Sequence, residues 1–242
     1  MNRSCIVAFD FGTAYSGYAF SLTLNESEVV RVKLWEQRKG VETSKAPTCV
    51  LFDEDQSFVE FGYKARDRYY EISKTSNNYY YFKDFKMELY NKEITKDLEI
   101  RDVNRRSMNA LKVFSAALRF LKEDALETID KEPNIPKGLW DFTWVLTVPA
   151  IWDEPARQFM RKAAVQVNIT PGSHCLQSNS GAATGPVLLR WVTHISYGGL
   201  QSCCSHRLCC RPRETPNSRR FTLNVGDYAT AEHFFFSLSL FR

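Results

Sequence analysis

The chain has 242 residues, of which 44% are hydrophobic, and its 32 lysine and arginine residues exceed its 28 acidic residues by four. This composition excludes a chain that is disordered throughout, and every apolar run is shorter than the roughly 20 residues that a membrane-spanning helix needs. An acidic residue at position 10 comes too early for a secretory signal peptide, so we expect an intracellular, cytoplasmic protein without a membrane span.

The first predicted elements are β-strands joined by glycine-containing turns. Residues 5–11 form a nearly continuous apolar run, typical of a buried strand, and residues 12–17 interrupt it with two glycines. Residues that favour strands resume at 18–24, so we expect a hairpin. Further strands are predicted at 29–35, 48–52 and 57–61.

Helices and one more strand follow. A helix is predicted from residue 62 to about residue 72. The clearest helix spans 107–129, where apolar residues recur at intervals of three and four along one face. An apolar strand at 144–148 ends at a proline, and acidic residues and a proline then begin a helix that spans 153–167. The order of these elements predicts a mixed α/β fold up to residue 170.

The composition changes abruptly after residue 170. Residues 1–170 carry 25 basic and 25 acidic residues, whereas residues 171–242 contain no lysine, 7 arginines, 3 acidic residues and five of the seven cysteines. No segment of this tail combines a helix start, a periodic body and a stop signal, although short apolar stretches occur, for example at 186–192. We expect residues 171–242 to form a divergent, poorly ordered tail, such as a frame or splicing break near residue 170 would produce.

The turn at Asp10–Gly17 is the first candidate site. A buried strand that ends in a carboxylate and runs into a tight hairpin exposes backbone N–H groups, which form a cradle for anions. Gly12 lets the backbone approach a phosphate without a Cβ in the way, and Asp10 is suited to hold a hydrated Mg²⁺. Taken alone, the pattern also fits an ordinary hairpin turn, and it is neither the Walker pattern nor the dinucleotide-binding glycine pattern.

Two further segments carry residues of interest. Lys83 and Lys86 alternate with aromatic residues at 82–87, where they either lie on a solvated face or place an ammonium beside a transferring phosphate. The apolar strand that ends at Pro149 continues into a helix that contains Arg157. This last pattern is also common in α/β architecture that carries no site.

Together, these segments resemble in order and spacing the nucleotide-binding domain of the 70-kDa heat-shock protein family, within the actin-like ATPase superfamily, and the detail points to the 12A/12B subgroup. The resemblance covers about residues 5–168. It rests on Ile6–Thr13, Ser16–Ser21, Lys45–Thr48, Phe61–Asp67, Phe85–Met87 and Trp144–Ala164. It implies lobe I of a two-lobed domain, built as a mixed sheet with flanking helices, with ATP and Mg²⁺ in the cleft between the lobes.

The resemblance also implies roles for single residues. Asp10 would contact the hydration shell of Mg²⁺, and Lys86 would position the attacking water and the γ-phosphate. Pro149 and Arg157 would form an interlobe relay that passes the nucleotide state to the substrate domain. The first phosphate loop would consist of Gly12, Thr13, Ala14 and Tyr15, in which Ala14 replaces a second hydroxyl residue and removes one side-chain bond to phosphate.

Several family features are absent from the sequence. No glutamate occurs between residues 155 and 213, where the family has a catalytic glutamate in a Glu-Pro-x-Ala-Ala segment, and residues 181–183 read Gly-Ala-Ala. The second phosphate loop, the adenosine segment and a substrate-binding domain have no counterpart, and residues 224–230 echo the loop with only one glycine. We therefore expect an ATP- or ADP-binding, chaperone-related chain that has lobe I alone, binds nucleotide weakly and has no ATPase activity of its own.

Other functions remain as alternatives. One is a non-catalytic fragment that keeps the lobe I fold and acts by binding a protein partner. A sugar kinase would share the Asp-x-Gly-Thr hairpin, but residues 85–87 and 148–152 argue against it. The vicinal pairs Cys203/Cys204 and Cys209/Cys210 lack the spacing of zinc sites, and the tail arginines lack the aromatic residues of a nucleic-acid platform, so we expect neither metal nor nucleic-acid binding there.

Overall fold

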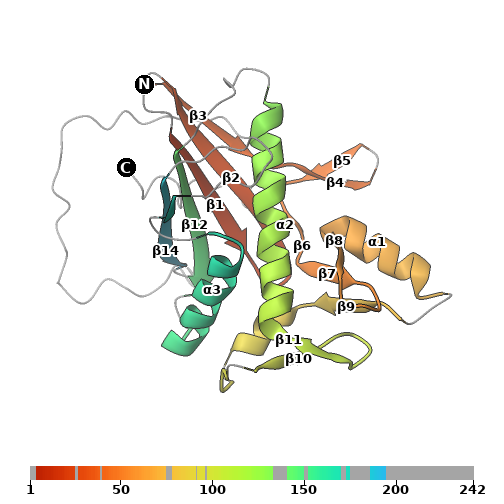
Figure 1. Cartoon of the computed structure of the whole chain (residues 1–242). Helices are drawn as coiled ribbons and strands as arrows, with labels where there is room; N and C mark the ends of the chain where they lie inside the picture. Colours follow the sequence, from red (N-terminus) through yellow and green to blue (C-terminus); the bar gives the residue numbers. More distant parts are fainter. Residues whose placement is uncertain are drawn as a thin grey trace, which may run out of the picture.

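The structure is a computed structural model of the chain, with a β-sheet at its centre and helices against that sheet (Figure 1). It describes residues 4–24, 27–38, 40–74, 78–90, 92–95, 97–132, 141–149, 152–169, 173–174 and 186–194. Most of the predicted lobe I therefore lies in the described part of the chain.

The main sheet has seven strands, in the order β13-β14-β12-β1-β2-β3, with β6 paired to β2. These strands are β1 (Ser4–Phe11), β2 (Tyr15–Leu24), β3 (Ser27–Val32), β6 (Ala46–Pro47), β12 (Asp141–Pro149), β13 (Ser173–His174) and β14 (Pro186–His194). β1, β12 and β14 run parallel, whereas β2 and β3 continue the sheet antiparallel. Parallel neighbours need a long crossover, and helix α3 (Glu154–Gln166) lies in the connection from β12 to β14. The sheet is therefore mixed, as predicted.

Strands β1 and β2 form the predicted hairpin. β2 begins at Tyr15, earlier than the predicted start at residue 18, because the ladder pairs Asp10 with Gly17 and Phe11 with Ser16. Alternate residues of β1 enter the main core, and Ala8 lies in a small apolar cluster of its own. The register therefore places Asp10 and Phe11 at the end of the ladder, directly before the turn.

Two helices, α2 (Ala110–Lys131) and α3, lie on the same face of the main sheet (Figure 1). α2 begins later than the prediction at 107–129, because its first three residues form strand β11 (Ser107–Asn109) instead. The Asn109 side chain then caps α2 by accepting from the Lys112 N–H, and Asp153 caps α3 through the Ala156 N–H. These caps decide where both helices begin.

Aromatic side chains fill the space between the main sheet and these two helices. Phe9 stacks on Trp144, with ring centroids 5.4 Å apart. Phe114 of α2 lies 6.1 Å from Phe11 and 5.1 Å from Phe159 of α3. All five side chains are buried, and burial of a side chain of this size contributes about 2–3 kcal/mol. These contacts hold the end of β1 against both helices.

A second, smaller sheet lies beside α2 and carries the remaining predicted elements. Its strands β7 (Cys49–Phe52), β8 (Phe58–Phe61) and β9 (Tyr80–Lys83) run in the order β8-β7-β9, and helix α1 (Gly62–Ile72) packs on β7. The predicted strand pair and the helix that follows it are therefore confirmed. Two short hairpins, β4 (Trp35–Arg38) with β5 (Val41–Thr43) and β10 (Glu99–Arg101) with β11, and the 3₁₀ helix η1 (Phe85–Leu89) complete the described elements.

The predicted strand at 29–35 is divided in the structure, which corrects the prediction. β3 ends at Val32 and β4 begins at Trp35. Between them, the Lys33 N–H still donates to the Tyr18 carbonyl of β2 at 3.1 Å, while its Nζ lies 3.1 Å from Asp124 and from Thr128 of α2. An apolar pattern does not show this polar contact with a distant helix.

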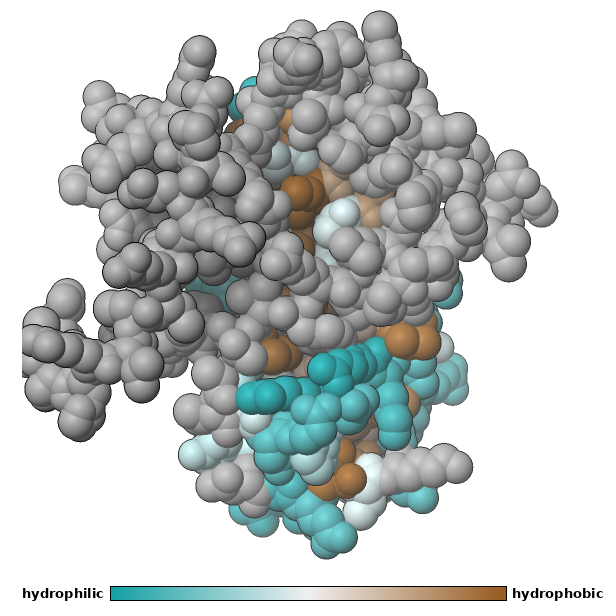
Figure 2. All heavy atoms as spheres, turned by 90° about the vertical axis from the view of Figure 1, so that its left-hand side faces the viewer, coloured by the Kyte–Doolittle hydropathy of each residue, from teal (hydrophilic) through white to brown (hydrophobic). Residues whose placement is uncertain are grey.

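Only a small part of the tail at 171–242 is described. The apolar stretch at 186–192, for which no strand was predicted, belongs to β14, which pairs with β12. The tail cysteines and residues 224–230 lie outside the described residues, so the structure does not test the predictions about them. None of the helices among the described residues is long and apolar enough to cross a membrane. In Figure 2, the described surface in the lower part of the molecule is mostly hydrophilic, with small hydrophobic patches.

Candidate functional site

The turn between β1 and β2 is held by a short chain of hydrogen bonds. The Gly12 N–H donates to the Ser16 hydroxyl at 3.2 Å, and this hydroxyl lies 2.7 Å from the hydroxyl of Thr48. The Thr48 N–H donates to the Ala14 carbonyl at 2.8 Å. Ser16 and Thr48 are buried, whereas Ala14 and Tyr15 are exposed. Buried hydroxyl groups thus fix the turn, while Ala14 and Tyr15 of the turn lie at the surface.

Gly12 is the residue that makes the shape of this turn possible. A Cβ added at Gly12 would lie 2.2 Å from the Tyr15 carbonyl oxygen, a distance that no side chain tolerates. Thr13 contacts η1 through its hydroxyl, 3.9 Å from the Met87 sulfur. The predicted phosphate loop of residues 12–15 is therefore a compact, specifically shaped turn; its role toward phosphate stays a prediction.

Lys86 of η1 is buried directly below the turn. Its Nζ donates to the Phe11 carbonyl, and the ammonium lies 5.7 Å from the Phe11 ring centroid and 5.1 Å from that of Trp152. Lys83, in contrast, is exposed, because the left-handed residue Asp84 (φ 53°) turns the chain between the two lysines. Lys83 therefore lies on a solvated face, whereas Lys86 is buried, and the place of its ammonium beside a transferring phosphate stays a prediction.

The charge of Lys86 is held in an unfavourable environment. Burial lowers the pKa of Lys86 to about 8, and the nearby carboxylate of Asp10 opposes this shift by raising the pKa. Lys86 is therefore mostly protonated at pH 7. Titratable groups whose pKa is strongly perturbed by burial cluster at functional sites, so this ammonium marks the turn as a candidate site.

Asp10, the predicted magnesium residue, is paired with a lysine. Its carboxylate lies 2.5 Å from the Nζ of Lys45, and both side chains are about one fifth exposed, at 21% and 23%. Lys45 precedes β6, which pairs with the start of β2, and its carbonyl accepts from the hydroxyls of Thr43 and Tyr63. The backbone of Lys45 is therefore fixed close to the end of β1.

The junction between β12 and α3 lies next to this site. Pro149 ends β12, its carbonyl accepts from the Trp152 N–H at 3.2 Å, and the Trp152 ring faces the Lys86 ammonium. Arg157 lies in the first turns of α3, where its N–H donates to the Asp153 carbonyl. Pro149 thus lies in the same neighbourhood as Lys86, whereas the relay roles of Pro149 and Arg157 stay predictions.

The local charges suit an anionic ligand. Lys45 and Lys86 bring two positive charges to the hairpin end and Asp10 brings one negative charge, which leaves a net charge of +1 beside an exposed glycine turn. Such a turn can bind phosphate through backbone N–H groups and charged donors. In the described ranges, no three His, Cys, Asp or Glu side chains gather as metal ligands. A Mg²⁺ ion at Asp10 would therefore need the phosphates and water for its other ligands.

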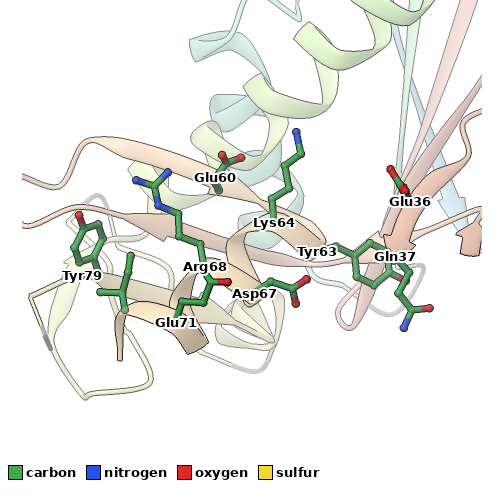
Figure 3. Close-up of a pocket in the computed structure, with 10 residues that line it drawn as sticks. Glu36, Gln37, Glu60, Tyr63, Lys64, Asp67, Arg68, Glu71 and Tyr79 are labelled. Atoms are coloured by element: carbon green, nitrogen blue, oxygen red, sulfur yellow. The ribbon is translucent and has the colours of Figure 1, made fainter. Parts of the chain in front are cut away.

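An open groove of about 620 Å³ lies beside α1 (Figure 3), and none of the turn residues 12–15 lines it. Its charged lining residues are Glu36, Glu60, Lys64, Asp67, Arg68 and Glu71. Its four carboxylates and two cations do not form a concentrated region of one charge. It therefore suits a nucleotide phosphate less well than the turn does.

The sequence did not single out three residues that build this site. Lys45 was part of a matched segment only, and Ser16 and Trp152 had no assigned role, yet all three reach Asp10, Gly12 or Lys86. Gly17 offered one usable signal, since a glycine within a strand often marks the close approach of another part of the chain. The segment that approaches Gly17, Ser44–Lys45, can be identified only from the structure.

Comparison with known proteins identifies relatives over about two thirds of the chain. Human (Homo sapiens) heat shock 70 kDa protein 12B is 42% identical over 165 residues, which cover 66% of this chain and 24% of the relative. Heat shock 70 kDa protein 12A from Mus musculus and from Homo sapiens is 39% identical over 168 residues, or 68% of this chain and 25% of each relative.

The chain thus spans about a quarter of the length of the curated relatives it matches. No family model matches the chain. The α/β fold, with its mixed sheet and flanking helices, agrees with the actin-like ATPase lobe that the sequence predicted. Over the shared segment, the chain is a relative of heat shock 70 kDa proteins 12A and 12B, which confirms the resemblance inferred from its motifs.

Proposed function

We propose that the chain binds ATP or ADP through its phosphates at the turn of residues 12–15, as part of a chaperone-related, cytoplasmic protein. The names of its relatives support the chaperone connection, since they are heat shock proteins. The shared segment is only part of each relative, so the proposal concerns binding at this site.

The buried ammonium of Lys86 carries the proposal. Lys86 is 6% exposed and donates to the Phe11 carbonyl, the last strand carbonyl before the turn at Gly12. Burial of an ammonium costs stability, and groups held at such a cost cluster at functional sites. Here the ammonium lies beside a turn in which a Cβ at position 12 would lie 2.2 Å from the Tyr15 carbonyl oxygen. A phosphate group at the turn would meet this charge and the exposed backbone together.

We propose no ATPase activity for the chain on its own. Hydrolysis needs a positioned water and several charge-stabilising groups acting as a unit. The resemblance places Mg²⁺ at Asp10 to neutralise charge on the phosphates, but in this chain the Asp10 carboxylate is paired with Lys45. The glutamate and the second phosphate loop have no counterpart in the sequence, so Lys86→Ala should leave the background hydrolysis rate unchanged.

Calorimetric titration of the 242-residue chain with ATP tests the proposal. We expect saturable binding with a dissociation constant above about 100 μM, because only part of a nucleotide cleft is present. Lys86→Met should weaken this binding by about tenfold, equivalent to about 1.4 kcal/mol.

The matched control is Lys83→Met, because Lys83 lies three residues away but is exposed, and it should bind ATP as the wild type does. An equal loss in both variants would show that general positive charge, not this site, binds ATP. Low-micromolar affinity, or no saturable binding, would contradict the proposal.

A further inference from the structure

We propose that Lys45 occupies the cation position beside Asp10, so that the site binds a polyphosphate without a divalent metal ion. This inference rests on the proposed function and names a residue with no assigned role. The resemblance places a hydrated Mg²⁺ at Asp10. In the structure, the cation at that carboxylate is the Lys45 ammonium instead.

The first observation is the ion pair itself. The Lys45 Nζ lies 2.5 Å from a carboxylate oxygen of Asp10, within a partly buried pair. Charge-assisted hydrogen bonds of this kind are the strong ones in proteins. A hydrated metal ion at Asp10 would have to displace the ammonium or share the carboxylate with it, and both positive charges would then repel each other.

The second observation is that the fold is shaped to bring Lys45 to this place. Gly17 lies directly opposite Asp10 in the β1–β2 ladder. A Cβ added at Gly17 would lie 3.3 Å from Cγ of Lys45 and 2.6 Å from the Ser44 carbonyl oxygen. The absence of a side chain at Gly17 therefore leaves the space through which the lysine stem crosses β2 to reach Asp10.

The third observation is that the backbone of Lys45 is anchored. Its carbonyl accepts from the Thr43 hydroxyl at 2.8 Å and from the Tyr63 hydroxyl at 3.3 Å. Tyr63 belongs to α1 and is buried, so two separate elements hold the segment before β6. An anchored backbone lowers the entropy cost of keeping the ammonium at Asp10.

The charges of the site then fit a phosphate chain without added metal. Lys45 lies on one side of the hairpin end at Asp10, and Lys86 lies at the Phe11 carbonyl. With both lysines protonated, the site is positive although Asp10 is ionised. Two fixed ammonium groups can neutralise phosphate oxygens that Mg²⁺ would otherwise neutralise.

A metal titration without nucleotide tests the cation position directly. Mn²⁺ is added to the ¹⁵N-labelled 242-residue chain, and paramagnetic broadening of the Phe11 and Gly12 amide signals is measured. We expect no selective broadening in the wild type or in Lys45→Arg, which keeps the cation, and selective broadening in Lys45→Met. The broadening should disappear again in Lys45→Met combined with Asp10→Asn.

A nucleotide titration tests the consequence for binding. For the wild type, ATP affinity in EDTA and in excess Mg²⁺ should agree within about threefold, whereas Lys45→Met should favour MgATP by about tenfold or more. Lys64→Met removes an exposed lysine of α1 and is the matched control, which should behave as the wild type.

Folding of each variant is checked separately. The amide signals of α2 and α3 should be unchanged in each variant, and Lys45→Gln replaces Lys45→Met if the latter fails to fold.

Each outcome decides the inference. Equal Mn²⁺ broadening in the wild type and in Lys45→Met, or broadening in neither, would overturn it, as would a wild type that binds ATP at least tenfold more tightly with Mg²⁺. If ATP and inorganic tripolyphosphate bind to no form of the chain, the proposed function fails. The Mn²⁺ result would still decide whether Lys45 holds the cation position.

Discussion

Two polar clusters hold the β1–β2 hairpin, and both contain a lysine paired with an aspartate. In the first, at the turn, Asp10 pairs with Lys45 while Lys86 lies buried nearby. In the second, the Tyr18 hydroxyl donates to Asp124 at 2.6 Å and lies 2.8 Å from the Thr128 hydroxyl, and Lys33 contacts both α2 residues. The second cluster joins β2 to α2.

The clusters differ in charge balance and in what surrounds them. The α2 cluster combines one carboxylate with one ammonium, and burial together with Asp124 raises the pKa of Tyr18, which keeps its hydroxyl neutral. The turn cluster has one carboxylate for two ammonium groups, beside a glycine turn. A balanced, mutually bonded cluster stabilises the fold, whereas the unbalanced cluster beside the turn is the one that we propose binds an anionic ligand.

The largest expected effect is a pH dependence of the unfolding free energy that comes from Lys86 of the turn cluster. Burial lowers the pKa of Lys86 to about 8, below the usual lysine value of about 10.4, so the unfolded chain binds more protons between these two values. Wild-type stability should therefore rise with pH across this window relative to Lys86→Met, by about 2–3 kcal/mol between pH 7 and 10.

Urea unfolding of both proteins at the two pH values measures this difference. Lys83→Met, which removes an exposed lysine, is the control and should follow the wild type across the window. A stability difference between wild type and Lys86→Met that stays constant with pH would show that folding does not lower the pKa of Lys86.

The next effect concerns the α2 cluster. Asp124→Ala removes the acceptor of Tyr18 and the partner of Lys33, and should lower the free energy of unfolding by about 2 kcal/mol. ATP affinity should not change, because Asp124 lies away from the turn. Chemical denaturation and calorimetry measure the two quantities on the same preparation.

Glu123→Ala is the matched control, since Glu123 precedes Asp124 on α2 and is exposed, and its effect should stay within about 0.5 kcal/mol. If Asp124→Ala weakens ATP binding as much as it lowers stability, the two clusters are not separate in function.

The smallest effect is the pH dependence of binding. Lys86 loses its charge as pH rises through about 8, so ATP affinity of the wild type should fall by about tenfold, or about 1.4 kcal/mol, between pH 7.5 and 9.5. In Lys86→Met the affinity should be lower and nearly constant over this range. Parallel curves for the two proteins would assign the pH dependence to other groups.

Local patterns predicted the elements but not every boundary between them. Continuous apolar runs located β1 and β12, apolar periodicity located α2, and acidic residues with a proline located the start of α3, because each of these features leaves a direct mark in the sequence. The division at Lys33 and the replacement of the start of α2 by β11 were missed. The side-chain contacts at these two places, from Lys33 to Asp124 of a distant helix and at the Asn109 cap, leave no mark in an apolar pattern.

The site was predictable only where a motif carried it. Asp10, Gly12 and Lys86 were singled out from local patterns and given roles by the resemblance, and the structure brings them together at one hairpin end. The Lys45 contact was missed, because it depends on the register that sets Gly17 opposite Asp10 and on anchoring by Tyr63. Such contacts depend on the packing of elements that are distant in the sequence.

The central claim is that the hairpin end is the nucleotide site, and mapping ATP binding on the amide NMR spectrum of the 242-residue chain tests it most directly. The account predicts gradual, saturating shifts centred on the amides of residues 12–15 and Lys86, with a dissociation constant above about 100 μM. Shifts centred on Lys64 and Arg68 of the α1 groove (Figure 3), or no shift at any residue with millimolar ATP, would contradict it.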